Sequence, residues 1–161
     1  MKPGCNPRDA FLEQLSQMRT IDVAELDDED LFGRDVSAWI NDVYRKRLDL
    51  ARRHFDDADY LRVGRKYKAS ITRYYYAMYS ACRGVAFRYH KGDDFQKHSD
   101  LPFNLPPTMA QKNRWANDLN EARIIRNQCD YEFYPSDEHL MKKANKLARR
   151  TRELLEYCNE A

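Results

Sequence analysis

Apolar and aromatic residues recur at helical period through residues 67 to 89, and this stretch limits the fold more than any other. One broad face of the helix carries Tyr67, Ile71, Tyr74, Tyr75, Met78, Cys82, Val85 and Tyr89. Small residues are interleaved with them, so a neighbouring helix can approach closely: Ala77, Ser80, Ala81 and Gly84. The pattern predicts a core helix of an all-α domain that keeps several polar aromatic side chains.

Residues that begin and end helices divide the N-terminal half of the chain. Asn6 followed by Pro7 is typical of a helix start, which predicts a short helix over residues 7–19. Apolar residues at a spacing of three and four predict a long helix over residues 36–62, and Gly64 can end it. The tyrosine-rich helix then follows over residues 66–89.

The C-terminal half contains two further helical patterns. Thr108 and Gln111 resemble a capping box before a helix that should end near Gln128. Ser136, followed by the two acidic residues Asp137 and Glu138, predicts the start of the last helix. No strand alternation and no internal repeat is visible. The expected fold is therefore all-α: an antiparallel up-and-down bundle of four main helices plus a short N-terminal helix.

The length of 161 residues suits one folded domain with an N-terminal extension. We expect residues 1–35 to hold the short helix and an acidic linker, and residues 36–161 to form the bundle. The linker, Asp22 to Asp35, is acidic, with a dense group at Glu25, Asp27, Asp28, Glu29 and Asp30. The formal net charge of +2 is too small to indicate a nucleic-acid-binding protein from charge alone.

Cysteine and histidine spacing gives no metal site. The four cysteines, Cys5, Cys82, Cys129 and Cys158, include no pair at zinc-finger or redox spacing, and we expect the last three to be buried thiols. The four histidines form no pair four residues apart, so no metal or other cofactor is expected. With no long apolar stretch, and with reduced thiols, the sequence favours a soluble cytoplasmic protein that does not contact a membrane.

Arg123, Arg126, Asn127, Asp130 and Tyr131 form the densest group of reactive side chains. Arg123 and Arg126 lie on one helix face, and Asp130 is within reach of Arg126 for an ion pair. One interpretation is a salt bridge at the helix end. The other is a polar pocket in which a guanidinium binds phosphate through two parallel hydrogen bonds. Spacing alone leaves both open.

Three other features have a structural interpretation, and for two of them a functional interpretation is also open. Tyrosines 74–79 are typical of helix packing, but such rings also stack on nucleic-acid bases. His98 follows Lys97 beside a proline-rich turn, where a histidine is usually only solvated. The basic last helix, with Arg149 and Arg150, is usually a solvated face, yet it could follow a phosphate backbone.

Three motifs in order resemble the HEPN-domain family. Residues 68–81, a helix with small residues and a Tyr-Tyr-Ala core at Tyr75-Tyr76-Ala77, resemble its signature helix. Lys97-His98-Ser99 resembles the Lys-x-His-Ser segment that often follows, and residues 126–131 resemble the Arg-Asn-x-x-Asp-Tyr variant. The resemblance covers about residues 37–158. It implies a helical bundle that usually forms a homodimer.

The same resemblance implies several functions. Many HEPN proteins are RNA-cleaving toxins or defence proteins, and some pair with a small nucleotidyltransferase. Catalytic members carry an arginine and, four to six residues later, a histidine. Here Asp130 and Tyr131 occupy those positions, so metal-independent ribonuclease activity is left open. Tyrosine titrates near 10, which makes it a poor base at neutral pH.

Our leading hypothesis is a protein that binds RNA or a nucleotide, as part of a toxin–antitoxin or defence system. Under this hypothesis Arg126 holds the phosphate and Asn127 orients that phosphate. Asp130 or Tyr131 takes the place of the histidine that catalytic HEPN proteins carry. The candidate ligand-binding residues are Arg123, Arg73 and His98.

The alternative is a non-catalytic helical interaction module that binds a nucleotidyltransferase or another toxin–antitoxin protein. A third interpretation gives the polar group only a role in pinning helix ends. Homodimerisation is expected partly because Tyr79, Arg83, Phe87 and Trp115 exceed what one small bundle is expected to bury.

Overall fold

The computed structural model describes residues 6–26, 32–131 and 136–160, and this part of the chain is helical with no strand. Its elements are α1 (Pro7–Leu15), α2 (Thr20–Ala24), α3 (Val36–Val63), α4 (Tyr67–His90), the 3-10 helix η1 (Leu101–Asn104), α5 (Lys112–Tyr131) and α6 (Asp137–Glu160). The all-α prediction is therefore confirmed for these residues. Most of the expected acidic run, Asp27 to Asp30, lies outside the described residues, as does Cys5.

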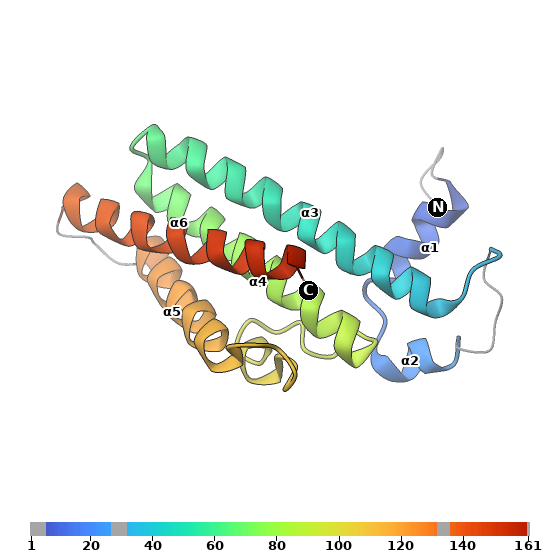
Figure 1. Ribbon diagram of the computed structural model, residues 1–161. Coiled ribbons are helices and arrows are strands. Elements are labelled where there is room, and N and C mark those ends of the chain that lie inside the picture. Colours follow the sequence, from blue (N-terminus) through green and yellow to red (C-terminus); the bar gives the residue numbers. More distant parts are fainter. Residues whose placement is uncertain (1–5, 27–31, 132–135, 161) are drawn as a thin grey trace.

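Helices α3 and α4 form a hairpin whose arms lie side by side along most of their length (Figure 1). The connection consists of three residues, of which Gly64 ends α3 as expected. The residue in the left-handed conformation is Arg65, with φ +58°, whereas Gly64 has φ −74°. Helix α4 packs against α3, α5 and α6, so it is the central helix of the fold.

Caps explain most of the helix boundaries. Asn6 accepts a hydrogen bond from the backbone N–H of Arg8, and Pro7 occupies the first position of α1, as predicted. Ser136 accepts one from the N–H of His139 at 3.3 Å, which confirms it as the residue before α6.

The capping box predicted at Thr108 is wrong. Helix α5 begins at Lys112, because Gln111 has φ +57° and its backbone cannot be part of a helix. The helix also continues to Tyr131, three residues beyond its predicted end at Gln128.

The main core lies where α4 meets α3, α5 and α6. Tyr74, Met78, Trp115 and Leu147 are each at most 2% exposed, in agreement with the helical stripes in the sequence. The thiols of Cys82, Cys129 and Cys158 are buried in the same core, as expected. Burial raises the pKa of Cys158 to about 12, so its thiol stays protonated at neutral pH.

A second core joins the N-terminal helices to the start of α3 and the end of α4. It is built from Leu12, Leu15, Val23, Val36, Trp39, Ile40, Val43 and Phe87. Helices α1 and α2 therefore cover one end of the α3–α4 hairpin (Figure 1). The predicted helix over residues 7–19 is shorter than expected and ends at Leu15, and α2 follows it.

This second core overturns one argument for a dimer. Phe87 is 1% exposed because the N-terminal helices cover it, and Trp115 is 2% exposed in the main core. Tyr79 is 8% exposed. The expectation that one chain could not bury these aromatic side chains was wrong, because the main core buries Tyr79 and Trp115 and the N-terminal helices cover Phe87.

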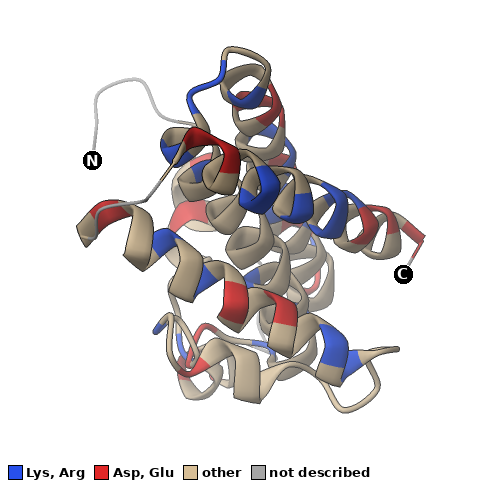
Figure 2. Cartoon of the chain, turned by 90° about the vertical axis from the view of Figure 1, so that its left-hand side faces the viewer, with Lys and Arg blue, Asp and Glu red and all other residues tan. Residues whose placement is uncertain are grey.

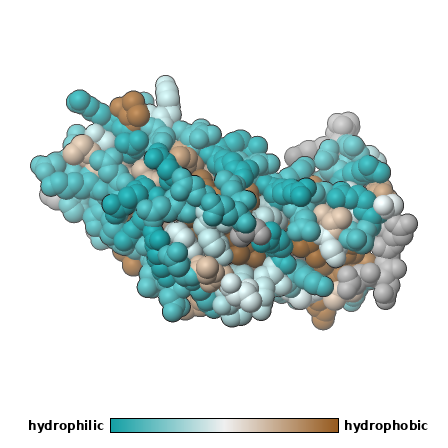
Figure 3. All heavy atoms as spheres, in the orientation of Figure 1, coloured by the Kyte–Doolittle hydropathy of each residue, from teal (hydrophilic) through white to brown (hydrophobic). Residues whose placement is uncertain are grey.

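The surface mixes charges of both signs. Lys and Arg as well as Asp and Glu are spread over the helices (Figure 2), and the face seen in Figure 3 is mainly hydrophilic. Within the described ranges, no helix carries an apolar stretch long enough to cross a membrane.

Candidate functional site

Arg126 lies on the face of α5 that packs against α4. Its guanidinium donates to the Tyr76 hydroxyl at 3.3 Å and to the Asn127 side-chain oxygen at 3.1 Å. Its Nε lies 2.9 Å from a carboxylate oxygen of Asp130, which confirms the ion pair expected from the spacing. The side chain is 26% exposed, so the guanidinium is held against the Tyr76 ring and does not extend into solvent.

Arg123 lies one helical turn before Arg126 and is also half-buried. It donates to the side-chain oxygen of Asn120 at 3.0 Å, while its buried Nε has no hydrogen-bond partner. The Nε of Arg126 likewise makes no hydrogen bond, because its ion pair with Asp130 has poor angular geometry. Two neighbouring guanidiniums therefore keep donor capacity that the chain does not use.

His98 comes from the connection between α4 and α5 and lies over the tyrosines of α4. Its Nδ1 is hydrogen-bonded to the hydroxyl of Tyr75. Its ring stacks on Tyr79 with 4.1 Å between centroids and 27° between planes. The imidazole is exposed on its other side, so it is both fixed in orientation and accessible to a ligand.

Electrostatics link this imidazole to the arginines. The pKa of His98 is lowered from its ordinary value, first by burial and then by the positive charges of Arg126, Arg83 and Arg123. Burial also raises the pKa of Tyr75, and Arg123 and Arg126 oppose that rise. We call the group formed by Tyr75, Tyr76, His98, Arg123 and Arg126 the Arg126 cluster.

A second histidine and arginine border the Arg126 cluster. Arg73 on α4 lies 3.3 Å from Nδ1 of His54 on α3, and the His54 ring is 5.9 Å from that of Tyr76. Burial and the charge of Arg73 lower the pKa of His54. Arg73, expected as a ligand-binding residue, thus lies at the edge of the cluster.

The structure brings together most, but not all, of the residues that the sequence singled out. Arg126, Asn127 and Asp130 are joined directly, and Arg123 and His98 lie beside them. Tyr131 is the last residue of α5 and is 83% exposed, so the structure does not draw it into the cluster.

Sequence reasoning missed the roles of Tyr75 and Tyr79 in orienting His98. Both are buried in the core, as the packing interpretation of the tyrosines requires, yet their hydroxyls reach polar partners. Their spacing of four residues was the available signal, since it places two rings on one face of a helix.

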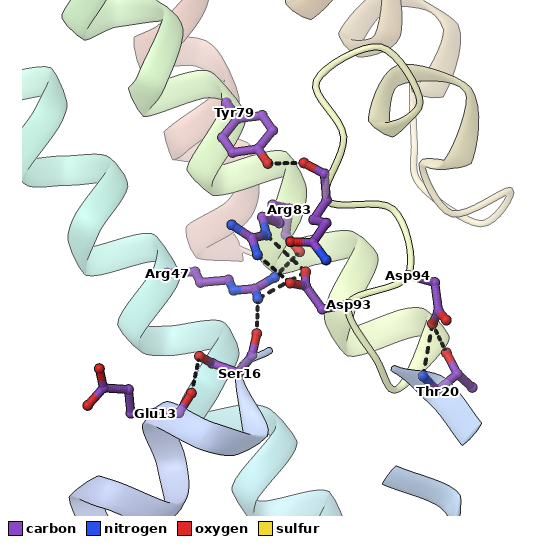
Figure 4. Close-up of polar contacts among 9 residues, drawn as sticks. Glu13, Ser16, Thr20, Arg47, Tyr79, Arg83, Asp93 and Asp94 are labelled. Atoms are coloured by element: carbon purple, nitrogen blue, oxygen red, sulfur yellow. Dashed lines mark hydrogen bonds and ion pairs between the residues drawn. The ribbon is translucent and has the colours of Figure 1, made fainter. Parts of the chain in front are cut away.

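A second polar group holds the connection that carries His98. The carboxylate of Asp93 is 2% exposed and is bound by Arg83 on α4, with Nε at 2.9 Å, and by Arg47 on α3 at 3.1 Å (Figure 4). Arg47 also donates to the backbone oxygens of Ser16 and Arg83. Burial lowers the pKa of Arg47 to about 10. We call Asp93, Arg47 and Arg83 the Asp93 clamp.

The N-terminal helices are attached to the same connection. The backbone N–H of Asp93 donates to the Met18 oxygen at 2.7 Å, and the Thr20 N–H donates to Asp94 at 2.9 Å (Figure 4). On the other side, the Tyr79 hydroxyl donates to the backbone oxygen of Gln96, two residues before His98. The position of His98 therefore depends on contacts with α1, α2, α3 and α4.

Among the residues that the structure describes, no three His, Cys, Asp or Glu side chains group as a metal ion would need. The chemistry available at the Arg126 cluster is that of guanidinium donors, an imidazole and tyrosine hydroxyls.

Comparison with known proteins gives no relative. No protein-family model matches the chain, and no curated protein and no solved structure matches it significantly.

Proposed function

We propose that this chain is a HEPN-like protein, built on an antiparallel bundle of α3, α4, α5 and α6, that binds the phosphate of RNA or of a nucleotide. The observation that carries the proposal is the convergence of two half-buried guanidiniums and one oriented imidazole from separate parts of the chain. A guanidinium suits a phosphodiester because its fork of donors matches two phosphate oxygens.

In this proposal Arg126 is the main phosphate ligand. Asn127 and Asp130 hold two sides of its guanidinium, and Tyr76 supports its face. Arg123 adds a second positive charge one turn away.

His98 is the group best placed to move a proton. If Nδ1 carries hydrogen and donates to Tyr75, then Nε2 offers its lone pair to a ligand. In RNA cleavage, Nε2 would accept the 2′-hydroxyl proton while that oxygen attacks phosphorus. The bond to the 5′-oxygen would break, and the leaving oxygen would take a proton from water. Arg126 would stabilise the negative charge on the phosphorus centre.

This role favours His98 over the residues expected to replace the missing histidine. Asp130 is engaged with Arg126, and Tyr131 is almost fully exposed, with no partner among the described residues to activate it. A lowered imidazole pKa keeps His98 neutral at pH 7, which is the form a general base needs.

Binding and cleavage of a short single-stranded RNA by three variants test the proposal. Removing a charged hydrogen-bond partner costs roughly 1.5–3 kcal/mol, so Arg126→Ala should weaken binding about 10- to 100-fold. His98→Gln should abolish cleavage and leave binding within about threefold of wild type. Arg149→Ala is the matched control: this exposed arginine of α6 has no hydrogen bond or ion pair within the described residues. Equal behaviour of Arg126→Ala and Arg149→Ala would remove the site.

The second candidate function is a non-catalytic module that contacts a nucleotidyltransferase or another toxin–antitoxin protein, as a homodimer or a heteromer. One observation favours a non-catalytic role for the polar group, including the third interpretation in which it only pins helix ends: Arg126 already contacts three groups of its own chain. Under this alternative, Asp130→Ala would lower the melting temperature while RNA binding is absent in all variants. Sedimentation at micromolar concentration, and copurification from the native host, would then identify the assembly.

A further inference from the structure

A cleft of about 550 Å³ opens between α1, α3 and α4. Its size is in the range of pockets that enclose one small ligand, and it is too small for a nucleic-acid duplex. Several of its residues are drawn in Figure 4. The lining consists of Asp9, Leu12, Glu13, Ser16, Gln17, Val43, Lys46, Arg47, Leu50, Arg53, Tyr79, Ser80, Arg83 and Gln96.

The cleft adjoins the Arg126 cluster through residues that border His98. Tyr79 lines the cleft and also stacks on the His98 ring at 4.1 Å. Arg83 lines the cleft, lies 5.9 Å from the Tyr79 ring centre, and contributes to the lowered pKa of His98. Gln96 lines it two residues before His98. The cleft therefore lies next to the His98 ring, with Tyr79 in contact with both.

The walls combine apolar surface with a guanidinium that is not engaged. Leu12 and Val43 are buried, while Leu50 is 40% exposed and offers apolar surface to a base. Arg53 is exposed one helical turn beyond Leu50, and it has no hydrogen bond or ion pair in the described part of the chain. Apolar contact with a base beside a cation for phosphate is the usual chemistry of single-stranded nucleic-acid sites.

The acidic residues that α1 contributes to the cleft do not cancel the positive charge of Arg53. Asp9 is paired with Lys46 at 3.3 Å. The carboxylate of Glu13 points away from Arg47 in Figure 4. In the Asp93 clamp, one carboxylate faces two guanidiniums, which leaves one excess positive charge at the inner end. The cleft is therefore positive on its α3 and α4 side.

We propose that this cleft is a second nucleotide subsite, which receives the nucleotide adjacent to the phosphate bound at Arg126 in a single-stranded RNA. The inference rests on the proposed function and adds its substrate class: an RNA strand of at least two nucleotides. Arg53 binds the phosphate of the second nucleotide, and the apolar surface at Leu50 supports its base.

Binding of uridine 3′-monophosphate and of a labelled uridine tetranucleotide to wild type and variants tests the subsite. The tetranucleotide should bind wild type roughly tenfold or more tightly than the mononucleotide. Arg53→Ala should remove most of that advantage and leave mononucleotide affinity unchanged. Arg52→Ala is the matched control, because this neighbouring arginine pairs with Asp49 and Asn159 on another face. Both substituted side chains are exposed, and circular dichroism verifies folding.

Each outcome decides between the two proposals. Equal affinity of wild type for both ligands, or equal effects of Arg53→Ala and Arg52→Ala, overturns the subsite while mononucleotide binding at Arg126 stands. If neither ligand binds wild type, or if Arg126→Ala changes neither affinity, the proposed function fails and the subsite fails with it.

Discussion

Removing the carboxylate of Asp93 should destabilise the protein more than removing any exposed carboxylate. The substitution Asp93→Ala leaves the two guanidiniums of Arg47 and Arg83 without their counter-charge. Their side chains are 11% and 26% exposed, and that of Asp93 is 2% exposed, so water screens this group weakly. The Asp93 clamp therefore belongs with buried ion pairs and not with surface pairs.

The expected loss in the free energy of unfolding depends on the contacts that the two arginines keep after the substitution. Loss of one partner of a buried pair costs about 3–5 kcal/mol. Arg47 keeps its hydrogen bonds to the backbone oxygens of Ser16 and Arg83, which places the expected loss near the lower limit, about 3 kcal/mol. For a chain of 161 residues this corresponds to a fall of roughly 6–12 °C in melting temperature.

Urea unfolding followed by circular dichroism measures this loss, with Asp49→Ala as control. Asp49 pairs with Arg52 on α3, with side chains 56% and 44% exposed, so its removal should cost at most about 1 kcal/mol. A double-mutant cycle with Arg47→Met should give a coupling energy of about 0.5–3 kcal/mol with Asp93→Ala. If Asp93→Ala costs no more than Asp49→Ala, the reasoning about the clamp is refuted.

Two further outcomes follow from the same region. The pKa values of His98 and His54 are lowered in the folded chain. Below the ordinary histidine pKa, near 6.5, the unfolded chain therefore binds more protons than the folded chain. The free energy of unfolding should fall as the pH drops through about 6.5. Urea unfolding between pH 5 and 7.5 should show a smaller fall in the free energy of unfolding for the double variant His98→Gln/His54→Gln than for wild type. The same dependence on pH in both proteins would contradict this. Gly92→Ala should cost about 1–3 kcal/mol in the same assay, because its Cβ would lie 2.2 Å from the Thr20 backbone nitrogen. Gly64→Ala, whose Cβ meets only contacts of 3.5 Å, should cost less than about 0.5 kcal/mol, and equal losses would disprove the close approach.

The helices could be predicted from the sequence because their signals are local. The spacing of apolar residues along residues 36–62 and 66–89 gave the α3–α4 hairpin, and Asn6 and Ser136 gave two helix starts. The error at Thr108 shows the limit of such signals. A capping box is a pattern of residue types, whereas the start of α5 depends on the backbone conformation of Gln111.

The site could be predicted only in part. The ion pair of Arg126 and Asp130 follows from a spacing of four residues within one helix. The position of His98 does not, because it depends on Asp93, whose partners lie 10 and 46 residues away along the sequence in Arg83 and Arg47. The burial of Phe87 by the N-terminal helices is another contact between distant segments that helical periodicity cannot show.

The central claim is that Arg126 and His98 belong to one phosphate-binding site. The NMR signals of the His98 ring, followed while uridine 3′-monophosphate is added, test this most directly. The account predicts a saturable shift and a rise in the imidazole pKa, because a bound phosphate adds negative charge beside it. Arg126→Ala should abolish both effects, and Arg149→Ala should preserve them. His98 signals that stay unchanged at saturating nucleotide, or that move equally in Arg126→Ala, would contradict the claim.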